Sequence, residues 1–226
     1  MSLFGWMKRK PRASAAPDGN TAIRDTLFGD MPLASLAAAG GDDPPWSFFR
    51  AAHRALESRD AIGARRELHR VLAMPELESR LVLQAWHALR ALGEQPPAAE
   101  EKHLLGVVVE VALDTGLDLL SAYADGSARY INFTGSAVIW EHPDETLDAE
   151  LGQLFRTANV VLQQIGPWDD PRPPAPQRGH ARLSMLTPRG LFFGQAPMTA
   201  LVADPLAAPA MQAATQLLQA LIAKAQ

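Results

Sequence analysis

The sequence predicts an α+β fold in which a helical, repeat-like N-terminal part packs on an antiparallel sheet with flanking helices. Between Leu104 and Glu141, four short runs of β-branched, aromatic and aliphatic residues are separated by Asp114-Thr115-Gly116, Asp125-Gly126 and Thr134-Gly135. Asp-Gly between two such runs is a strong hairpin signal, because a type I′ turn needs positive φ at both central positions. These four runs therefore predict an antiparallel meander. Two later runs, His180 to Leu186 and Gly190 to Ala196, predict a further hairpin.

Apolar residues at helical spacing predict five helices around these strands. Three lie between Trp46 and Gly93, with stripes at Phe48, Phe49, Ala52, Ala55 and Leu56, then Ile62, Ala64, Leu68, Val71 and Leu72, then Leu81, Val82, Ala85, Trp86, Leu89 and Leu92. A fourth runs from Thr146 to Ile165 and ends at Gly166-Pro167. The last begins near Asp204-Pro205, because Asp is a good N-cap and Pro a good first helical residue.

The chain divides into three predicted parts: a basic tail and linker over 1–45, a helical part over 46–98, and an α+β domain over 99–226. Within the linker, one short element between Ile23 and Leu36 is expected to lie on the body. The chain shows no signal-peptide pattern, and its apolar runs are shorter than a membrane span requires. It contains no cysteine, which excludes disulfides, thiolate metal sites and cysteine nucleophiles. These features predict a cytoplasmic protein.

Charge is unevenly distributed along the chain. Residues 94–226 carry eight basic and fifteen acidic groups, whereas residues 44–93 carry eight arginines and five acids. The acidic part argues against a nucleic-acid partner. The arginine-rich part is interpreted as solvated helix faces that dock internally, or alternatively as a surface that attracts an anionic partner.

The helices between Trp46 and Gly93 also repeat. Phe48, Ala52 and Ala55 recur 34 residues later as Val82, Trp86 and Leu89, and Arg59 corresponds to Gly93. This pattern resembles a tetratricopeptide repeat, whose period is 34 residues. The resemblance covers about one and a half units, which cannot bury their own apolar faces. It therefore implies that these helices pack on the sheet that follows.

From the third helix onward, the predicted order is helix, four strands, helix, two strands, helix. This order resembles the class of small α+β proteins that includes type III secretion chaperones. The resemblance implies a surface that is presented to another protein, and a bacterial origin, although a fold alone does not fix a function.

No pattern in the sequence indicates a cofactor or a metal. The six histidines lack His-Glu-x-x-His or His-x-His spacing, and no nucleophile elbow or phosphate-binding loop occurs. An acidic run from Glu141 to Glu150 is interpreted as a complement to a helix N-terminus, with a paired-carboxylate catalyst as the sharper alternative.

Two features of the sequence are candidate contact sites. Glu110 and Arg129 are charged residues within otherwise apolar strands. They predict a cross-sheet ion pair or two charges at the rim of the sheet, with a ligand-binding pair as the sharper alternative. At the N-terminus, an apolar and basic cluster predicts either a frayed tail or a weak peripheral contact with a membrane or partner through Phe4, Trp6, Lys8, Arg9 and Lys10.

Two functions follow from these observations. The first is a cytosolic, non-enzymatic protein-interaction module, which would be an adaptor, a chaperone-like protein or a regulatory protein whose partner is another protein. The second is a small-molecule-binding protein or hydrolase with a polar pocket near Glu110 and Arg129, or near His142 to Glu150. A concave pocket with convergent polar side chains would favour the second function, and an exposed apolar groove would favour the first.

Overall fold

A six-stranded antiparallel sheet forms the centre of the structure, a computed structural model that describes residues 21–224. The strands are ordered β4-β3-β2-β1-β5-β6. Their bounds are β1 Gly106–Ala112, β2 Leu117–Tyr123, β3 Ala128–Ile131, β4 Ala137–Trp140, β5 His180–Thr187 and β6 Gly190–Pro197. The predicted meander and the predicted hairpin are thus confirmed, and they join through the antiparallel pair of β1 with β5.

The turn between β2 and β3 differs from the predicted type I′ turn. Gly126 has φ +83°, but Asp125 does not have a positive φ. The Asp125 carboxylate instead accepts hydrogen bonds from the backbone N–H groups of Ser127 and Ser79, at 2.9 and 2.7 Å. An aspartate that bonds backbone groups in this way stabilises a turn without needing positive φ. It also ties the turn to the start of the helix at Ser79.

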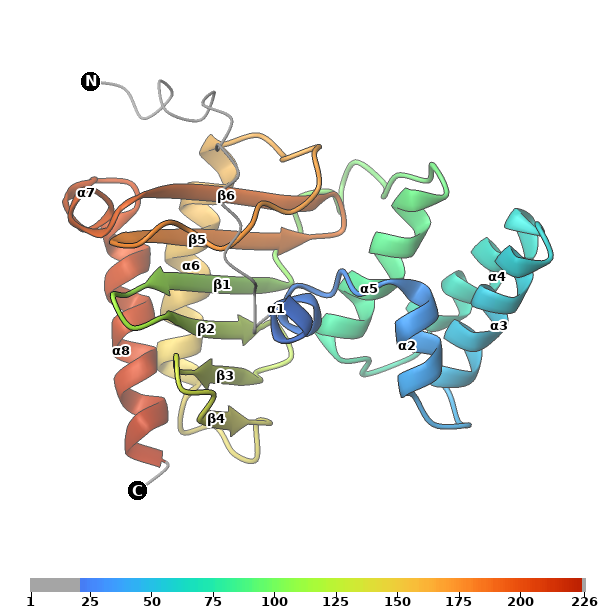
Figure 1. Cartoon of the computed structure of the whole chain (residues 1–226), viewed down its shortest axis with the longest axis horizontal. Coiled ribbons are helices and arrows are strands. Elements are labelled where there is room, and N and C mark those ends of the chain that lie inside the picture. The colour runs from blue at the N-terminus through green and yellow to red at the C-terminus, as the bar shows by residue number, and fades with distance from the viewer. Residues whose placement is uncertain (1–20, 225–226) are drawn as a thin grey trace.

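Two long helices cover one face of the sheet, here called the back. They are α6 (Asp148–Gln164) and α8 (Ala208–Lys224), and both lie behind the strands in Figure 1. The main apolar cluster lies between them and the sheet, and it includes Val107, Val109, Leu120, Leu183, Leu154, Leu162 and Leu217. The short helix α7 (Met198–Ala203) was not predicted. Asp204 follows it and accepts hydrogen bonds from the N–H groups of Leu206 and Ala207, in the turn before α8. The last helix therefore begins at Ala208, later than the start predicted near Asp204-Pro205.

A different set of elements covers the opposite face, here called the front. Helix α1 (Thr21–Phe28) is seen almost end-on at the end of β1 and β2, and α5 (Ser79–Ala91) lies beside the end of the sheet (Figure 1). A second apolar cluster, here called the front cluster, forms from Leu27 and Phe28 of α1, Leu83 of α5 and sheet residues such as Val108 and Leu119. Both faces of the central strands are therefore covered, which confirms the α+β fold with flanking helices.

The remaining helices form a separate layer beyond α5. They are α2 (Leu33–Ala39), α3 (Trp46–Glu57) and α4 (Ala61–Leu72). A third apolar cluster, here called the helical cluster, joins them to α5 and includes Leu36, Phe49, Leu68, Val71, Trp86 and Leu89. The expectation that these helices pack on the sheet is therefore correct for α5. It is wrong for α3 and α4, which bury their apolar faces against other helices. Arg59 has φ +60°, a conformation that favours glycine, at the position that corresponds to Gly93.

The segment before α3 is more ordered than the linker interpretation implies. Where one short element was expected between Ile23 and Leu36, the structure contains the two helices α1 and α2, separated by Gly29 with φ +61°. Leu27 and Phe28 are buried in the front cluster, and Leu36 is buried in the helical cluster. This segment therefore connects the front cluster to the helical cluster.

Replacing Trp86 with alanine should destabilise the fold strongly. The indole is buried in the helical cluster, so its removal should lower the free energy of unfolding by about 3–5 kcal/mol. Urea denaturation of the full chain measures this change. Ile62→Ala is the control, because Ile62 is 78% exposed and should cost less than about 0.5 kcal/mol. A Trp86 variant as stable as the control would show that the ring is not part of the core.

Candidate functional site

Glu110 and Arg129, the predicted pair, lie on the front face but do not meet. Glu110 belongs to β1, Arg129 belongs to β3, and β2 separates the two strands. Arg129 lies opposite Ser121 of β2, whereas Glu110 lies opposite Leu119. Each side chain forms an ion pair with other residues. Glu110 and Arg129 therefore belong to two distinct charged sites and form no ion pair with each other.

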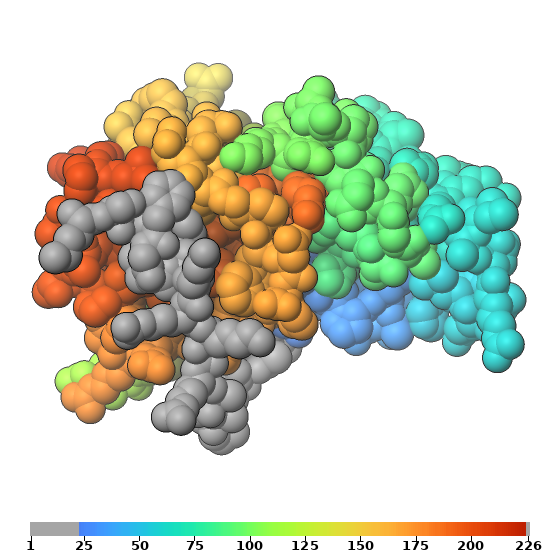
Figure 2. Space-filling view, turned by 90° about the horizontal axis from the view of Figure 1, so that it is seen from above, coloured from blue at the N-terminus to red at the C-terminus, as the bar shows by residue number. Residues whose placement is uncertain are grey.

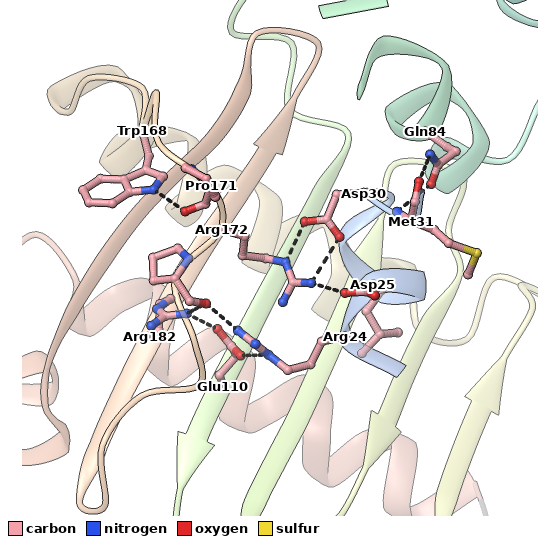
Figure 3. Close-up of polar contacts among 12 residues, drawn as sticks. Arg24, Asp25, Asp30, Met31, Gln84, Glu110, Trp168, Pro171, Arg172 and Arg182 are labelled. Carbon is pink, nitrogen blue, oxygen red and sulfur yellow. Dashed lines mark hydrogen bonds and ion pairs between the residues drawn. The ribbon is translucent and has the colours of Figure 1, made fainter. Parts of the chain in front are cut away.

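The Glu110 carboxylate lies between two guanidinium groups at the centre of the sheet. Oε1 accepts a hydrogen bond from Nε of Arg24 at 2.7 Å, and Oε2 accepts one from Nη1 of Arg182 at 2.9 Å (Figure 3). Arg24 comes from α1 and Arg182 from β5, and all three side chains are buried. A buried carboxylate needs such charge-assisted bonds, because desolvation of an unpaired charge costs several kcal/mol. Glu110 thereby fixes α1 to the sheet.

Arg182 extends the contacts of Glu110 toward the segment 167–178. Its guanidinium also donates hydrogen bonds to the side-chain oxygen of Gln195 and to the carbonyl of Pro174. Burial lowers the pKa of Arg182 to about 10, the charge of Glu110 opposes this shift, and the charge of Arg24 adds to it. Arg182 therefore remains charged at neutral pH and depends on Glu110 as its counterion.

A second arginine, Arg172, ties the same segment to the end of α1. Its Nε donates to Asp30 at 2.6 Å, and its Nη2 bonds Asp30 and Asp25 (Figure 3). Burial alone would lower the pKa of Arg172, but the hydrogen bond and charge of Asp30, together with Asp25 and Glu110, raise it. The Arg24–Glu110–Arg182 triad and the Arg172 pairs thus hold α1 and 167–178 together over the front of the sheet.

Arg129 lies on β3, which pairs with the edge strand β4. Its Nη2 donates to Glu141 at 2.5 Å, and its Nη1 is buried without a hydrogen-bond partner. Arg129 is opposite Ile139 of β4 in the strand register. Ile139 is 59% exposed, whereas Trp140 on the back of the same strand is buried. The front of β4 therefore presents an apolar side chain to solvent beside a partly satisfied guanidinium.

Strand β4 also ends the sheet, and the hydrogen-bond pattern shows which of its backbone groups are open. Asn132 donates its backbone N–H to the carbonyl of Ser136, which makes this a hydrogen-bonded pair. Such pairs alternate with non-hydrogen-bonded pairs in an antiparallel ladder, so Tyr130–Val138 is hydrogen-bonded and Arg129–Ile139 is not. The N–H and C=O of Ile139 consequently point away from β3, toward an edge that is open in the sense that no other strand of residues 21–224 pairs with it. At the opposite edge, Trp168 donates its N–H to the carbonyl of Leu191 on β6.

A cleft of about 470 Å³ lies where α5 meets 167–172 and the turn between β5 and β6. Its walls include the aromatic and aliphatic side chains of Phe28, Leu83, Trp168 and Leu191, and the polar side chains of His87 and Arg90. Arg172 and Arg189 also line it. The cleft adjoins the buried network through Arg172, but neither Glu110 nor Arg129 lines it. This cleft is therefore a different site from the polar pocket that was predicted near those two residues.

The histidines and the acidic run are distributed among local contacts. His142 bonds Asp148 at 2.9 Å, and His69 bonds Glu94 at 2.6 Å. Asp148 and Glu150 lie in the first turn of α6, as expected for acids that complement a helix N-terminus. Within residues 21–224, no group of three or more His, Asp or Glu side chains is arranged to hold a metal ion.

The predicted N-terminal contact residues Phe4, Trp6, Lys8, Arg9 and Lys10 lie outside the described residues. Among the helices that are described, none has the length and apolarity to cross a membrane.

Comparison with known proteins identifies no relative. No protein-family model, curated protein or solved structure matches this chain.

The two charged sites, one around Glu110 and one around Arg129, should differ sharply in their contribution to stability. Glu110→Gln removes the charge that two buried guanidiniums share, and we expect it to lower the free energy of unfolding by about 3–5 kcal/mol. Glu141→Gln is the matched change at the partner of Arg129. Because Glu141 is 59% exposed, its replacement should cost no more than about 1 kcal/mol. Chemical denaturation of both variants measures the difference, and equal costs would contradict the central position given to Glu110.

Proposed function

We propose that this chain is a non-enzymatic protein-interaction module of the cytoplasm, which acts as an adaptor, a chaperone-like protein or a regulatory protein. The observation that carries this proposal is the open edge of β4. There, a row of outward-facing backbone groups is combined with the exposed apolar side chain of Ile139. The partner is an extended segment of another polypeptide, which adds a strand to the sheet beside β4.

The chemistry of this edge supports strand addition. An unpaired edge offers backbone N–H and C=O groups that an extended peptide can satisfy, and the side chains that alternate along the strand supply specificity. On the front of β4, Ala137 and Ile139 are both exposed. On the back, Trp140 anchors the strand against the core with Lys224 over its ring. The edge is therefore held rigidly from behind while its front remains available.

The charges near the edge bear on the choice of partner. The C-terminal part of the chain is acidic overall, which disfavours nucleic acid. Glu110 is enclosed by Arg24 and Arg182, so it is not available to a ligand without disruption of the fold. A protein partner fits these features better than a substrate held by Glu110 and Arg129. The proposal also includes a bacterial origin and a likeness of the chain to tetratricopeptide repeats and to type III secretion chaperones.

Site-specific photocrosslinking tests this function. A benzophenone amino acid at Ala137, on the front of β4, should capture a polypeptide in cells that produce the full chain. Ile139→Pro should reduce the crosslinked product by about tenfold, because it removes an outward N–H and the apolar side chain. Since this N–H takes no part in the ladder with β3, the variant should still fold. Ile139→Val is the matched control, because it keeps both the N–H and an apolar side chain.

One control measurement and two contradicting outcomes complete this test. The same crosslinker at Val160 on α6, which is 56% exposed, should capture nothing specific. Retention of the Ala137 product in Ile139→Pro would contradict strand addition. A product that consists only of two copies of this chain would contradict the proposed heterologous partner.

A further inference from the structure

Three arginines line the cleft between α5 and the β5–β6 turn, and one of them has no carboxylate in direct contact within residues 21–224. Figure 2 shows the segment coloured orange, which includes 167–178, against the green segment that follows α5. The turn between β5 and β6 is joined to α5 by a hydrogen bond from Arg90 to the carbonyl of Pro188. It is joined to the segment after α5 by a hydrogen bond from the N–H of Arg189 to the carbonyl of Glu101. The cleft thus has walls from distant parts of the chain, which are held together by specific bonds.

Two of the three arginines that line the cleft are already neutralised. Arg172 forms a two-pronged pair with Asp30, at 2.6 and 3.2 Å. Arg189 donates to Asp169 at 2.7 Å. Asp170, the third carboxylate of the lining, is exposed to solvent. These pairs leave the cleft with one guanidinium whose charge is not balanced by a direct contact.

That guanidinium belongs to Arg90, in the last turn of α5. Its Nη1 donates to the carbonyl of Pro188 at 2.6 Å, and within residues 21–224 it forms no ion pair with a carboxylate. Burial lowers the pKa of Arg90 to about 10, and repulsion by Arg189 adds to this effect while Asp30 opposes it. Arg90 is still charged at neutral pH, and without a carboxylate in direct contact its desolvation is compensated only in part, by the more distant charge of Asp30.

We propose that this cleft binds a small organic anion whose carboxylate or phosphate group pairs with Arg90. A guanidinium binds either group through two parallel N–H donors, which adds orientation to charge. The site is independent of the proposed strand addition, because β4 and the β5–β6 hairpin lie at opposite edges of the sheet.

The rest of the lining fits the body of such a molecule. The volume of about 470 Å³ is in the range of small-molecule sites. Phe28, Trp168 and Leu191 provide apolar walls, and the Trp168 ring is fixed edge-on against Phe193 at 5.2 Å. Burial lowers the pKa of His87, as do Arg90 and Arg172, while Asp30 opposes the shift. His87 is therefore neutral at pH 7 and offers hydrogen bonding without further charge.

The probes of this site are benzoate, inorganic phosphate and the neutral analogue benzamide. Each is titrated into the full chain while nitrogen-15 NMR follows the Trp168 indole N–H, assigned with Trp168→Phe. We expect saturable shifts with benzoate or with phosphate and none with benzamide. Saturation by benzoate alone assigns a carboxylate ligand, and saturation by phosphate alone assigns a phosphorylated one.

Arginine variants decide whether Arg90 is the binding group. Arg90→Gln should raise the dissociation constant by at least about tenfold. Arg90→Lys, which keeps the charge but loses the planar fork, should raise it by less. Arg54→Gln is the matched control, because Arg54 is an exposed arginine on α3, and its dissociation constant should change by less than about twofold.

Three results would overturn the proposal. They are the absence of saturation by both anions, equal shifts with benzamide, and unchanged affinity in a folded Arg90→Gln variant. If Arg90→Gln unfolds, the order of affinities among wild type, Arg90→Lys and Arg54→Gln decides the question. An Arg90→Lys protein that binds as tightly as wild type would show that the guanidinium fork does not hold the anion.

Discussion

The buried carboxylate of Glu110 is the constraint on which the front of this molecule depends. It is fully buried in the middle of β1 and forms ion pairs with both Arg24 from α1 and Arg182 from β5. Without it, two guanidiniums would be left in an apolar layer, and such a state is strongly unfavourable. The orientation of α1 on the sheet therefore follows from one charged residue in a strand of valines.

The position of α1 in turn determines the surrounding architecture. Phe28 and Asp30, at and just after its end, reach the cleft wall and the Arg172 pair. The turn after α1 is tied to α5, because Gln84 accepts from the Met31 N–H and donates to its carbonyl, at 3.0 and 2.7 Å. The helical cluster is thus coupled to the sheet through α1 and α5. The proposed anion site lies at this junction, whereas the β4 edge lies apart from it.

Local patterns in the sequence predicted most of the elements but not their contacts. Asp-Gly turns, alternating strands and helical stripes located the meander, the hairpin and the five main helices. The charge of Glu110 within β1 was recognised, but its partners Arg24 and Arg182 lie 86 and 72 residues away, and no local signal connects them. The exposure of Ile139 depends on β4 being an edge strand, which follows from the strand order. The cleft combines segments from α1 to β6, so its lining could not be derived from spacing.

A double-mutant cycle between Arg24 and Glu110 tests most directly whether this network fixes α1 to the sheet. Arg24→Met, Glu110→Gln and the double variant are compared with the original chain by chemical denaturation. If the two residues form a buried pair, the effects of the single changes should not be additive, and the coupling free energy should be at least about 1 kcal/mol. Effects that add to within about 0.3 kcal/mol would contradict the account, because they would show that the two residues act independently.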